Sequence, residues 1–183
     1  MLAAGSGERF GGGKQLADLD GRPLLEHVLA AMAAAPLERV VVVLGAQADE
    51  IRAGVDLHGA RAVICPDWRE GQAASLRAGI AALDGAGPAV VVLGDQPRIS
   101  ARAIERVLGA RSPDAAAVRA TYAGTPGHPV VLERALFDAI ARLRGDEGAR
   151  TLLGGVAVRD VACDGLGRPD DVDTPEQLEV LRA

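Results

Sequence analysis

Residues 1–14 read MLAAGSGERFGGGK, a short apolar segment that runs directly into a loop of glycines and cations. Half of residues 5–14 are glycine, with Arg9 and Lys14 among them. Glycine adopts positive φ at little cost, so successive backbone N–H groups of such a loop can turn into one concavity. Their partial charges and the two cations together favour an anion. The stretch therefore predicts a loop built around phosphate.

Two familiar nucleotide loops fit this segment poorly. A Walker loop requires GxxxxGK followed by Ser or Thr, but Glu8 stands at its first glycine and Gln15 at its hydroxyl residue. The dinucleotide fingerprint GxGxxG matches Gly5 and Gly7 but has Phe10 at its third glycine. A flexible, solvated turn is the structural alternative. The position directly after an apolar strand favours a phosphate loop instead.

Composition limits the classes of partner. A chain of 183 residues is ordinary for one domain, so we expect residues 1–183 to form a single domain. The net charge of −5 comes from interleaved acids and bases, which predicts no nucleic-acid partner. No apolar run is long enough to span a bilayer, so we expect no membrane partner. Cys65 and Cys163 lack disulfide or zinc spacing, which fits the cytoplasm.

Strand-length apolar runs alternate with helical patterns over the first 110 residues. The expected strands are apolar on both faces, as in a sheet covered on both sides, and the helices carry apolar residues at helical spacing. Such repeats form a parallel sheet with right-handed crossovers. The strands are expected at 39–44, 60–65 and 88–93, and the helices at 23–35, 46–53, 72–83 and 101–110.

The rhythm changes after residue 112. Mixed strands are expected at 115–120, 129–132 and 156–161, with a helix at 135–143 and a glycine-punctuated stretch at 145–155. Thr174 and Gln177 form a capping box that opens a terminal helix, with Pro175 at its first position. At the other end, the first strand has only four residues, which leaves the completeness of the natural N-terminus open.

Carboxylates lie at two places suited to a metal. Asp95, in the segment GDQP, follows an expected central strand, and ligands of open α/β sheets bind at that edge. Alternatively, Asp95 could only hydrogen-bond the backbone of a turn before Pro97. The presence of the glycine loop in the same chain favours the metal role. Asp171 and Asp173 precede a helix that Thr174 can already cap. Either carboxylate is therefore available to a metal or to the helix dipole.

Two segments suit contacts with a substrate. In WREGQAASL (68–76), Gly71 permits close backbone approach and the Ser75 hydroxyl can reach a base, unless Ser75 is simply an early helix residue. His128, in GHP, is either a substrate contact or a structural hydrogen-bonding residue. In GDEGAR, Asp146 is a candidate cap for the next helix, and Arg150 is either a solvated cation or a contact for an acceptor phosphate or pterin.

The segment from Leu2 to Lys14 satisfies the pattern LAAGxGxRxGxxK, and GDQP, GHPVVL, GDEGAR and DVDTPE follow it in order. Together they closely resemble the molybdenum cofactor nucleotidyltransferase family, in particular its cytidylyltransferase branch. This resemblance covers nearly the whole chain. It implies a three-layer α/β/α sandwich with the Rossmann-like nucleotide-diphospho-sugar transferase fold and a mostly parallel, mixed sheet.

The resemblance also implies an activity: transfer of a nucleoside monophosphate from an NTP to molybdopterin or a similar phosphorylated acceptor, with Mg²⁺ and release of pyrophosphate. LAAG, in place of the LAGG typical of the guanylyl branch, favours CTP. The implied partners include a molybdoenzyme or its chaperone. Alternatives are a guanylyl or other NTP transferase, an NAD(P)H-dependent oxidoreductase, and a nucleotide-binding protein without catalysis.

Residue roles follow from the motifs and the resemblance. We expect Arg9, Lys14 and Asp95 to be catalytic, Asp95 and Asp173 to hold the metal, and His128 and Arg150 to bind the acceptor. The expected nucleotide-binding residues are Leu2, Ala3, Ala4, Gly5, Ser6, Gly7, Gly13, Lys14, Gly71, Ser75 and Asp95.

Overall fold

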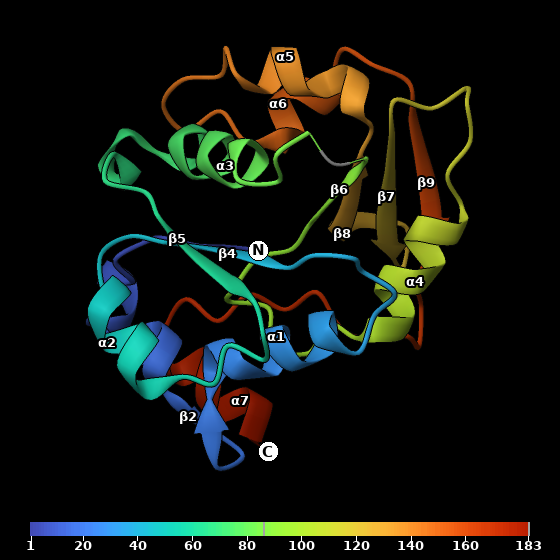
Figure 1. Ribbon diagram of the computed structural model, residues 1–183. Helices are drawn as coiled ribbons and strands as arrows, with labels where there is room; N and C mark the ends of the chain where they lie inside the picture. The colour runs from blue at the N-terminus through green and yellow to red at the C-terminus, as the bar shows by residue number, and fades with distance from the viewer. Residues whose placement is uncertain (86, 183) are drawn as a thin grey trace.

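The computed structural model describes residues 1–85 and 87–182 and is built around a mixed sheet (Figure 1). In one half of the sheet, parallel pairing joins β1 to β4 and β4 to β5. In the other half, β8 pairs antiparallel with β6 and β7, and β7 pairs parallel with β9. The strands are β1 (Leu2–Ala3), β4 (Val41–Leu44), β5 (Arg61–Ile64), β6 (Ala89–Val91), β7 (Ala117–Tyr122), β8 (Thr125–Leu132) and β9 (Val158–Ala162).

Leu2 joins the two halves of the sheet. Its backbone N–H donates to the carbonyl of Val92 at 3.0 Å, and its own carbonyl accepts from Gly94 at 2.9 Å. Leu2 also forms a parallel bridge with Leu93. The resulting strand order is β5-β4-β1-β6-β8-β7-β9. The loops after residues 3, 44, 64 and 93 therefore leave the sheet at one edge, which is the edge where open α/β sheets bind ligands.

Helices cover both faces of the sheet. In Figure 1, α3, α5 and α6 lie on one face and α1 and α2 on the other, with α7 beyond α1. α4 packs with α1 against the second face. This arrangement is the expected three-layer sandwich. The helices are α1 (Leu24–Ala33), α2 (Ala48–Gly54), α3 (Gln72–Ala81), α4 (Ala101–Gly109), α5 (Phe137–Ile140), α6 (Ala149–Leu153) and α7 (Pro175–Arg182).

Local chemistry explains where several helices begin. The predicted capping box is present at α7: the Gln177 amide donates to Thr174 Oγ1 at 3.3 Å, and the Thr174 amide donates to Gln177 Oε1 at 3.0 Å. Ser100 caps α4 by accepting from the Ala103 amide at 3.2 Å. These bonds satisfy amides that have no partner inside the helix. The terminal helix is thereby fixed directly after Asp173.

Several expectations need correction. β5 is an edge strand, so it is not fully covered: Ile64 is 46% exposed. The helix expected at 135–143 is shorter, with the 3₁₀ turn η4 (Arg134–Leu136) leading into α5, and α6 forms inside the glycine-punctuated stretch. After β1 come the 3₁₀ turns η1 (Glu8–Phe10) and η2 (Lys14–Leu16). An unpredicted hairpin, β2 (Asp18–Leu19) with β3 (Arg22–Pro23), then separates them from α1.

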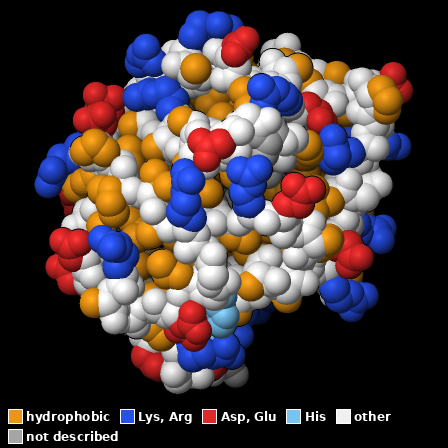
Figure 2. Space-filling model, viewed as in Figure 1, with side chains coloured by type: hydrophobic (Ala, Val, Ile, Leu, Met, Phe, Trp, Pro, Cys, Tyr) orange, Lys and Arg blue, Asp and Glu red, His pale blue; other side chains and the backbone are white. Residues whose placement is uncertain are grey.

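Charges are interspersed on the face in Figure 2, where basic and acidic side chains alternate over apolar surface and do not gather into a block of one sign. Within the described residues, no helix has both the length and the apolarity needed to cross a membrane.

Candidate functional site

A pocket of about 570 Å³ lies at the carboxyl edge of the sheet, between the loop after β1 and the start of α3. Its wall joins segments that are far apart in the sequence, from Gly5 in the first loop to Asp146 before α6. Ten of the predicted nucleotide-binding residues line it: Leu2, Ala3, Ala4, Gly5, Ser6, Gly7, Lys14, Gly71, Ser75 and Asp95.

The glycine loop is held close to β1 beside this pocket. Gly7 has a φ of 67°, and a Cβ atom there would lie 3.1 Å from the Cβ of Lys14, so a side chain would crowd the lysine. Gln15 ties the loop to β1, because its Nε2 donates to the carbonyls of Ala3 at 3.3 Å and Gly5 at 2.9 Å. The loop is therefore ordered by hydrogen bonds of its own segment.

Two of the predicted loop residues lie off the pocket wall. The Gly13 amide donates instead to Gln47 Oε1 at 3.1 Å. Arg9 is also absent from the wall, and its side chain is 75% exposed. The Gly12 amide donates back to a carbonyl within the loop at 3.1 Å. The amides of Gly12 and Gly13 are thus used inside the protein, and the first part of the loop, residues 5–8, lines the pocket instead.

Lys14 connects the three charged motifs predicted from the sequence. Its Nζ lies 2.8 Å from Asp95 Oδ2 and 3.1 Å from Asp173 Oδ1. Arg9 contacts the other oxygen of Asp173 at 3.0 Å. The Lys14 side chain is 10% exposed, so this ion-pair cluster is shielded from water more than a surface pair would be. Residues 14, 95 and 173 thus converge on one point.

Backbone and side-chain bonds place Asp173 in this cluster. The Val172 amide donates to the Asp95 carbonyl at 2.9 Å, which ties the C-terminal segment to the end of the central strand. Gln96 Nε2 donates to Asp171 Oδ1 at 2.8 Å. Burial raises the pKa of Asp171, and the hydrogen bond from Gln96 offsets part of that rise. Asp171 is thereby engaged with Gln96, while Asp173 contacts Lys14.

The donor set fits a divalent cation. Asp95 Oδ1 is buried and has no hydrogen-bond partner, so it retains an acceptor for a ligand. Asp95 and Asp173 both offer hard carboxylate oxygens to the same point. Within the described residues, no group of three or more His, Cys, Asp or Glu side chains could hold a metal alone. Two carboxylates with substrate phosphates and water match the way proteins hold Mg²⁺.

The start of α3 forms the opposite wall of the pocket. The guanidinium of Arg69 lies 4.4 Å from the centre of the Trp68 ring, a cation–π contact at the pocket wall. Ser75 is 6% exposed and lies in the pocket wall. Gly71 has a φ of 112°, and a Cβ there would lie 2.4 Å from the Gly145 carbonyl. The close approach at Gly71 is therefore made by another loop of the protein.

His128 and Arg150 line a second pocket of about 320 Å³. This pocket shares Leu2, Gln72 and Asp146 with the wall of the first, so the two pockets are neighbours. Burial lowers the pKa of His128 to about 4, and the charge of Asp95 opposes part of that shift. His128 is therefore neutral near pH 7. Arg150 supplies the positive charge of this pocket.

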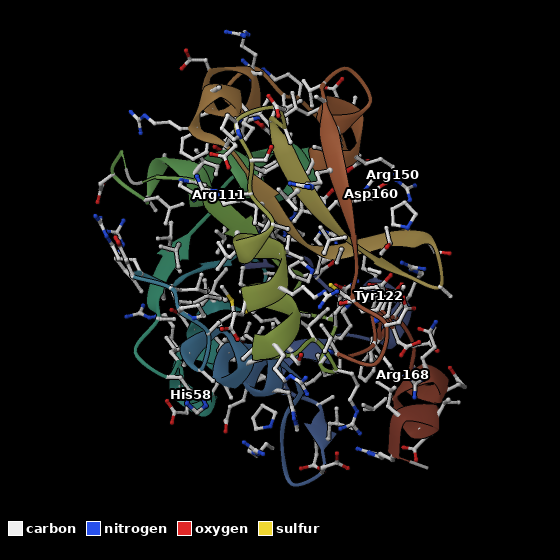
Figure 3. The ribbon with its side chains drawn as sticks, turned by 90° about the vertical axis from the view of Figure 1, so that its right-hand side faces the viewer. His58, Arg111, Tyr122, Arg150, Asp160 and Arg168 are labelled. Atoms are coloured by element: carbon white, nitrogen blue, oxygen red, sulfur yellow. The ribbon has the colours of Figure 1, made fainter. Side chains whose placement is uncertain are left out.

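A third cavity, of about 290 Å³, has a different character. Its lining is largely apolar and includes Met32 and Ile80. Arg111 at its margin is held by both carboxylate oxygens of Glu133, at 2.6 and 2.9 Å. Figure 3 shows Arg111 and Arg150 on opposite sides of the molecule in that view. The polar groups suited to chemistry therefore lie in the two neighbouring pockets.

Sequence reasoning missed several residues of the site. Gln15 stands out in the sequence only as a mismatch to the Walker loop, yet it fixes the glycine loop to β1. Asp146 is a candidate helix cap by sequence, but Gly148 occupies the cap position of α6 and Asp146 lines both pockets. Gln72 also lines both. The sequence signal for Gln72 and Asp146 is limited to their position within the two glycine-containing segments.

Comparison with known proteins finds relatives that span nearly the whole chain. Residues 1–161 match the family model described as MobA-like NTP transferase domain. Nicotine blue oxidoreductase of Paenarthrobacter nicotinovorans is 35% identical, over 97% of this chain and 92% of that protein. Purine catabolism protein PucB of Bacillus subtilis (strain 168) is 30% identical, over 100% of this chain and 94% of that protein.

A solved structure of similar sequence has the same fold. The crystal structure of Rv0371c from Mycobacterium tuberculosis H37Rv is 34% identical, with a TM-score of 0.89 over 98% of this chain and 93% of that chain. A complex of Rv0371c with manganese is 32% identical, with a TM-score of 0.84 over 98% of this chain and 94% of that chain. The predicted Rossmann-like transferase fold is therefore confirmed.

Proposed function

Because the chain belongs to the MobA-like NTP transferase family, we propose that it transfers a nucleoside monophosphate from an NTP to a phosphorylated acceptor and releases pyrophosphate. CTP is the favoured donor and molybdopterin the favoured acceptor, on the motifs LAAG, GHP and GDEGAR. We also propose that residues 1–183 act as one nucleotidyltransferase domain in the cytoplasm, where a molybdoenzyme or its chaperone would receive the product.

The observation that carries this proposal is the convergence of Lys14 with Asp95 and Asp173. The two contacts of Nζ, at 2.8 and 3.1 Å, lie beside a pocket whose wall includes the glycine loop. A triphosphate needs cationic and N–H donors, and its divalent cation needs carboxylates. Both sets of groups are present at one place.

In the proposed reaction, a terminal phosphate oxygen of the acceptor attacks the α-phosphorus of the NTP. A new P–O bond forms, the bond to the β-phosphate oxygen breaks, and pyrophosphate leaves with that electron pair. The attacking phosphate is already ionised, so no strong general base is required. Lys14 and the Gly5–Gly7 backbone would stabilise the charge that develops on the leaving group.

Divalent metal chemistry belongs to the same proposal. Asp95 and Asp173 would hold Mg²⁺, or the Mn²⁺ named for Rv0371c, and the bound ion would neutralise phosphate charge. The second pocket would orient the acceptor. There, Arg150 would pair with its phosphate and neutral His128 would contribute a hydrogen bond.

Pyrophosphate release tests the proposal. The purified protein is incubated with Mg²⁺, molybdopterin and each of the four NTPs in turn, and pyrophosphate is measured with time. The expected result is release that needs the acceptor and is fastest with CTP. Nucleotide binding without release in every combination would instead support a nucleotide-binding protein without catalysis.

A second candidate function rests on one comparison. The 35% identity to a protein named nicotine blue oxidoreductase favours an NAD(P)H-dependent reductase on this scaffold. The incomplete dinucleotide fingerprint, with Phe10 at the third glycine, argues against it. Loss of NADPH absorbance with nicotine blue as the electron acceptor, without pyrophosphate release from any NTP, would favour the reductase.

A further inference from the structure

Lys14 is the only lysine among the 20 Lys and Arg residues of the chain. Its ammonium group contacts one carboxylate oxygen of Asp95 and one of Asp173. Lysine is a compact point charge on a flexible stem, whereas arginine carries a planar fork that favours fixed bidentate pairs. The Lys14 ammonium is therefore suited to hold the two carboxylates together, and its flexible stem also allows it to move away from them.

Cationic groups occupy most of the oxygens that a divalent ion would need. Lys14 takes Asp95 Oδ2 and Asp173 Oδ1, and Arg9 takes Asp173 Oδ2. The fourth carboxylate oxygen of this pair of residues, Asp95 Oδ1, is buried and has no hydrogen-bond partner. An ammonium group and a divalent cation repel each other at such short range, so both cannot sit between the same carboxylates.

We propose that Lys14 is an internal counter-ion that keeps Asp95 and Asp173 from binding a divalent cation until a nucleoside triphosphate arrives. The polyphosphate draws the Lys14 ammonium away from the carboxylates, which then become available to the cation that accompanies the nucleotide. This inference rests on the proposed function of the same site. Its consequence is that cation and nucleotide bind together, while the cation alone binds weakly.

Calorimetric titration with Mn²⁺ in the absence of nucleotide tests the competition directly. Lys14→Met removes the ammonium and keeps an unbranched side chain of similar length. We expect its Mn²⁺ affinity to exceed that of the wild type by on the order of tenfold, a typical coupling between two linked events. Affinity equal to or weaker than that of the wild type would overturn the proposal.

Arg9→Met is the matched control, because it removes the same charge from Asp173 but leaves Lys14 between the carboxylates. We expect at most a few-fold change in Mn²⁺ affinity, since Arg9 is largely exposed. An increase as large as that of Lys14→Met would show a general charge effect and would also overturn the proposal.

A measurement on the wild type covers the case in which Lys14→Met does not fold. Biosynthetic [¹³Cε]lysine gives one NMR signal, because the chain has one lysine. A non-hydrolysable CTP analogue should shift this signal, while Mg²⁺ alone should not at the concentration that saturates the ternary complex. A full shift with Mg²⁺ alone would contradict the proposal. Neither experiment depends on pyrophosphate release, so failure of the transfer reaction is a separate result.

Discussion

The two neighbouring pockets are built differently. The first is formed largely by loops that leave strand ends, and two of its charged residues are paired: Lys14 contacts Asp95 at 2.8 Å, and it also contacts Asp173 beside the pocket at 3.1 Å. The second lies between the segment that includes α6 and residues of β1, α3, β6 and β8, and its cation, Arg150, is exposed. We infer that the first pocket carries the chemistry, which requires fixed charges, and that the second selects the acceptor.

The largest expected effect is in the first pocket. Lys14→Ala and Asp95→Ala should each lower kcat for pyrophosphate release by about a hundredfold, the scale of losing one preorganised charge contact. Steady-state kinetics with CTP and acceptor measure this loss. Near-normal kcat in both variants would contradict the role of this pocket.

The wall between the pockets should be sensitive to one methyl group. Gly71→Ala places a Cβ 2.4 Å from the Gly145 carbonyl at a φ of 112°, so we expect the free energy of unfolding to fall by about 2 kcal/mol. Urea unfolding of the wild type and the variant measures this difference in the free energy of unfolding. Gly109→Ala is the control, because a Cβ there has no atom within 4 Å. Equal stability of the two variants would mean that the loop at Gly145 yields easily.

A smaller effect is expected in the second pocket. Arg150→Ala should raise KM for the acceptor by about tenfold, the effect of losing a charge-assisted contact of about 1.4 kcal/mol, and leave KM for CTP nearly unchanged. Kinetics with each substrate varied in turn separate the two constants. A matching rise in KM for CTP would remove the distinction between the pockets.

The lowered pKa of His128, in the second pocket, predicts that the stability of the protein depends on pH. Burial lowers its pKa from 6.5 to about 4, so between these values the unfolded state binds more protons. The free energy of unfolding should therefore fall as pH drops from 6.5 to 4. In His128→Gln this fall should be smaller by about 2 to 3 kcal/mol. Parallel urea series across that range compare the two proteins, and identical slopes would contradict the shift.

Arg9 should have the smallest effect. Because its side chain is 75% exposed, Arg9→Ala should lower kcat by only a few-fold. The same kinetic assay applies. A loss as large as that of Lys14→Ala would show that Arg9 moves into the pocket when substrate binds.

Local sequence signals predicted much of the fold. The alternation of apolar runs and helical patterns located β4, β5 and the first four helices, and the Thr174 capping box located α7. The exposed position of β5 was missed, because strand order depends on tertiary pairing. The β2–β3 hairpin was missed as well, since each of its strands has only two residues.

The candidate site was accessible from the sequence only in part. The motifs singled out Lys14, Asp95 and Asp173, but their ion pairs join residues up to 159 positions apart, which no local pattern reports. The shared wall at Gln72 and Asp146 likewise depends on how α3 packs against the loop before α6.

The most direct test of the central claim is pyrophosphate release by the wild type and by Asp95→Ala, measured in parallel with Mg²⁺, CTP and molybdopterin. The account predicts acceptor-dependent release by the wild type and a rate about a hundredfold lower for Asp95→Ala. Equal rates for the two proteins, or no release by the wild type with any of the four NTPs, would contradict it.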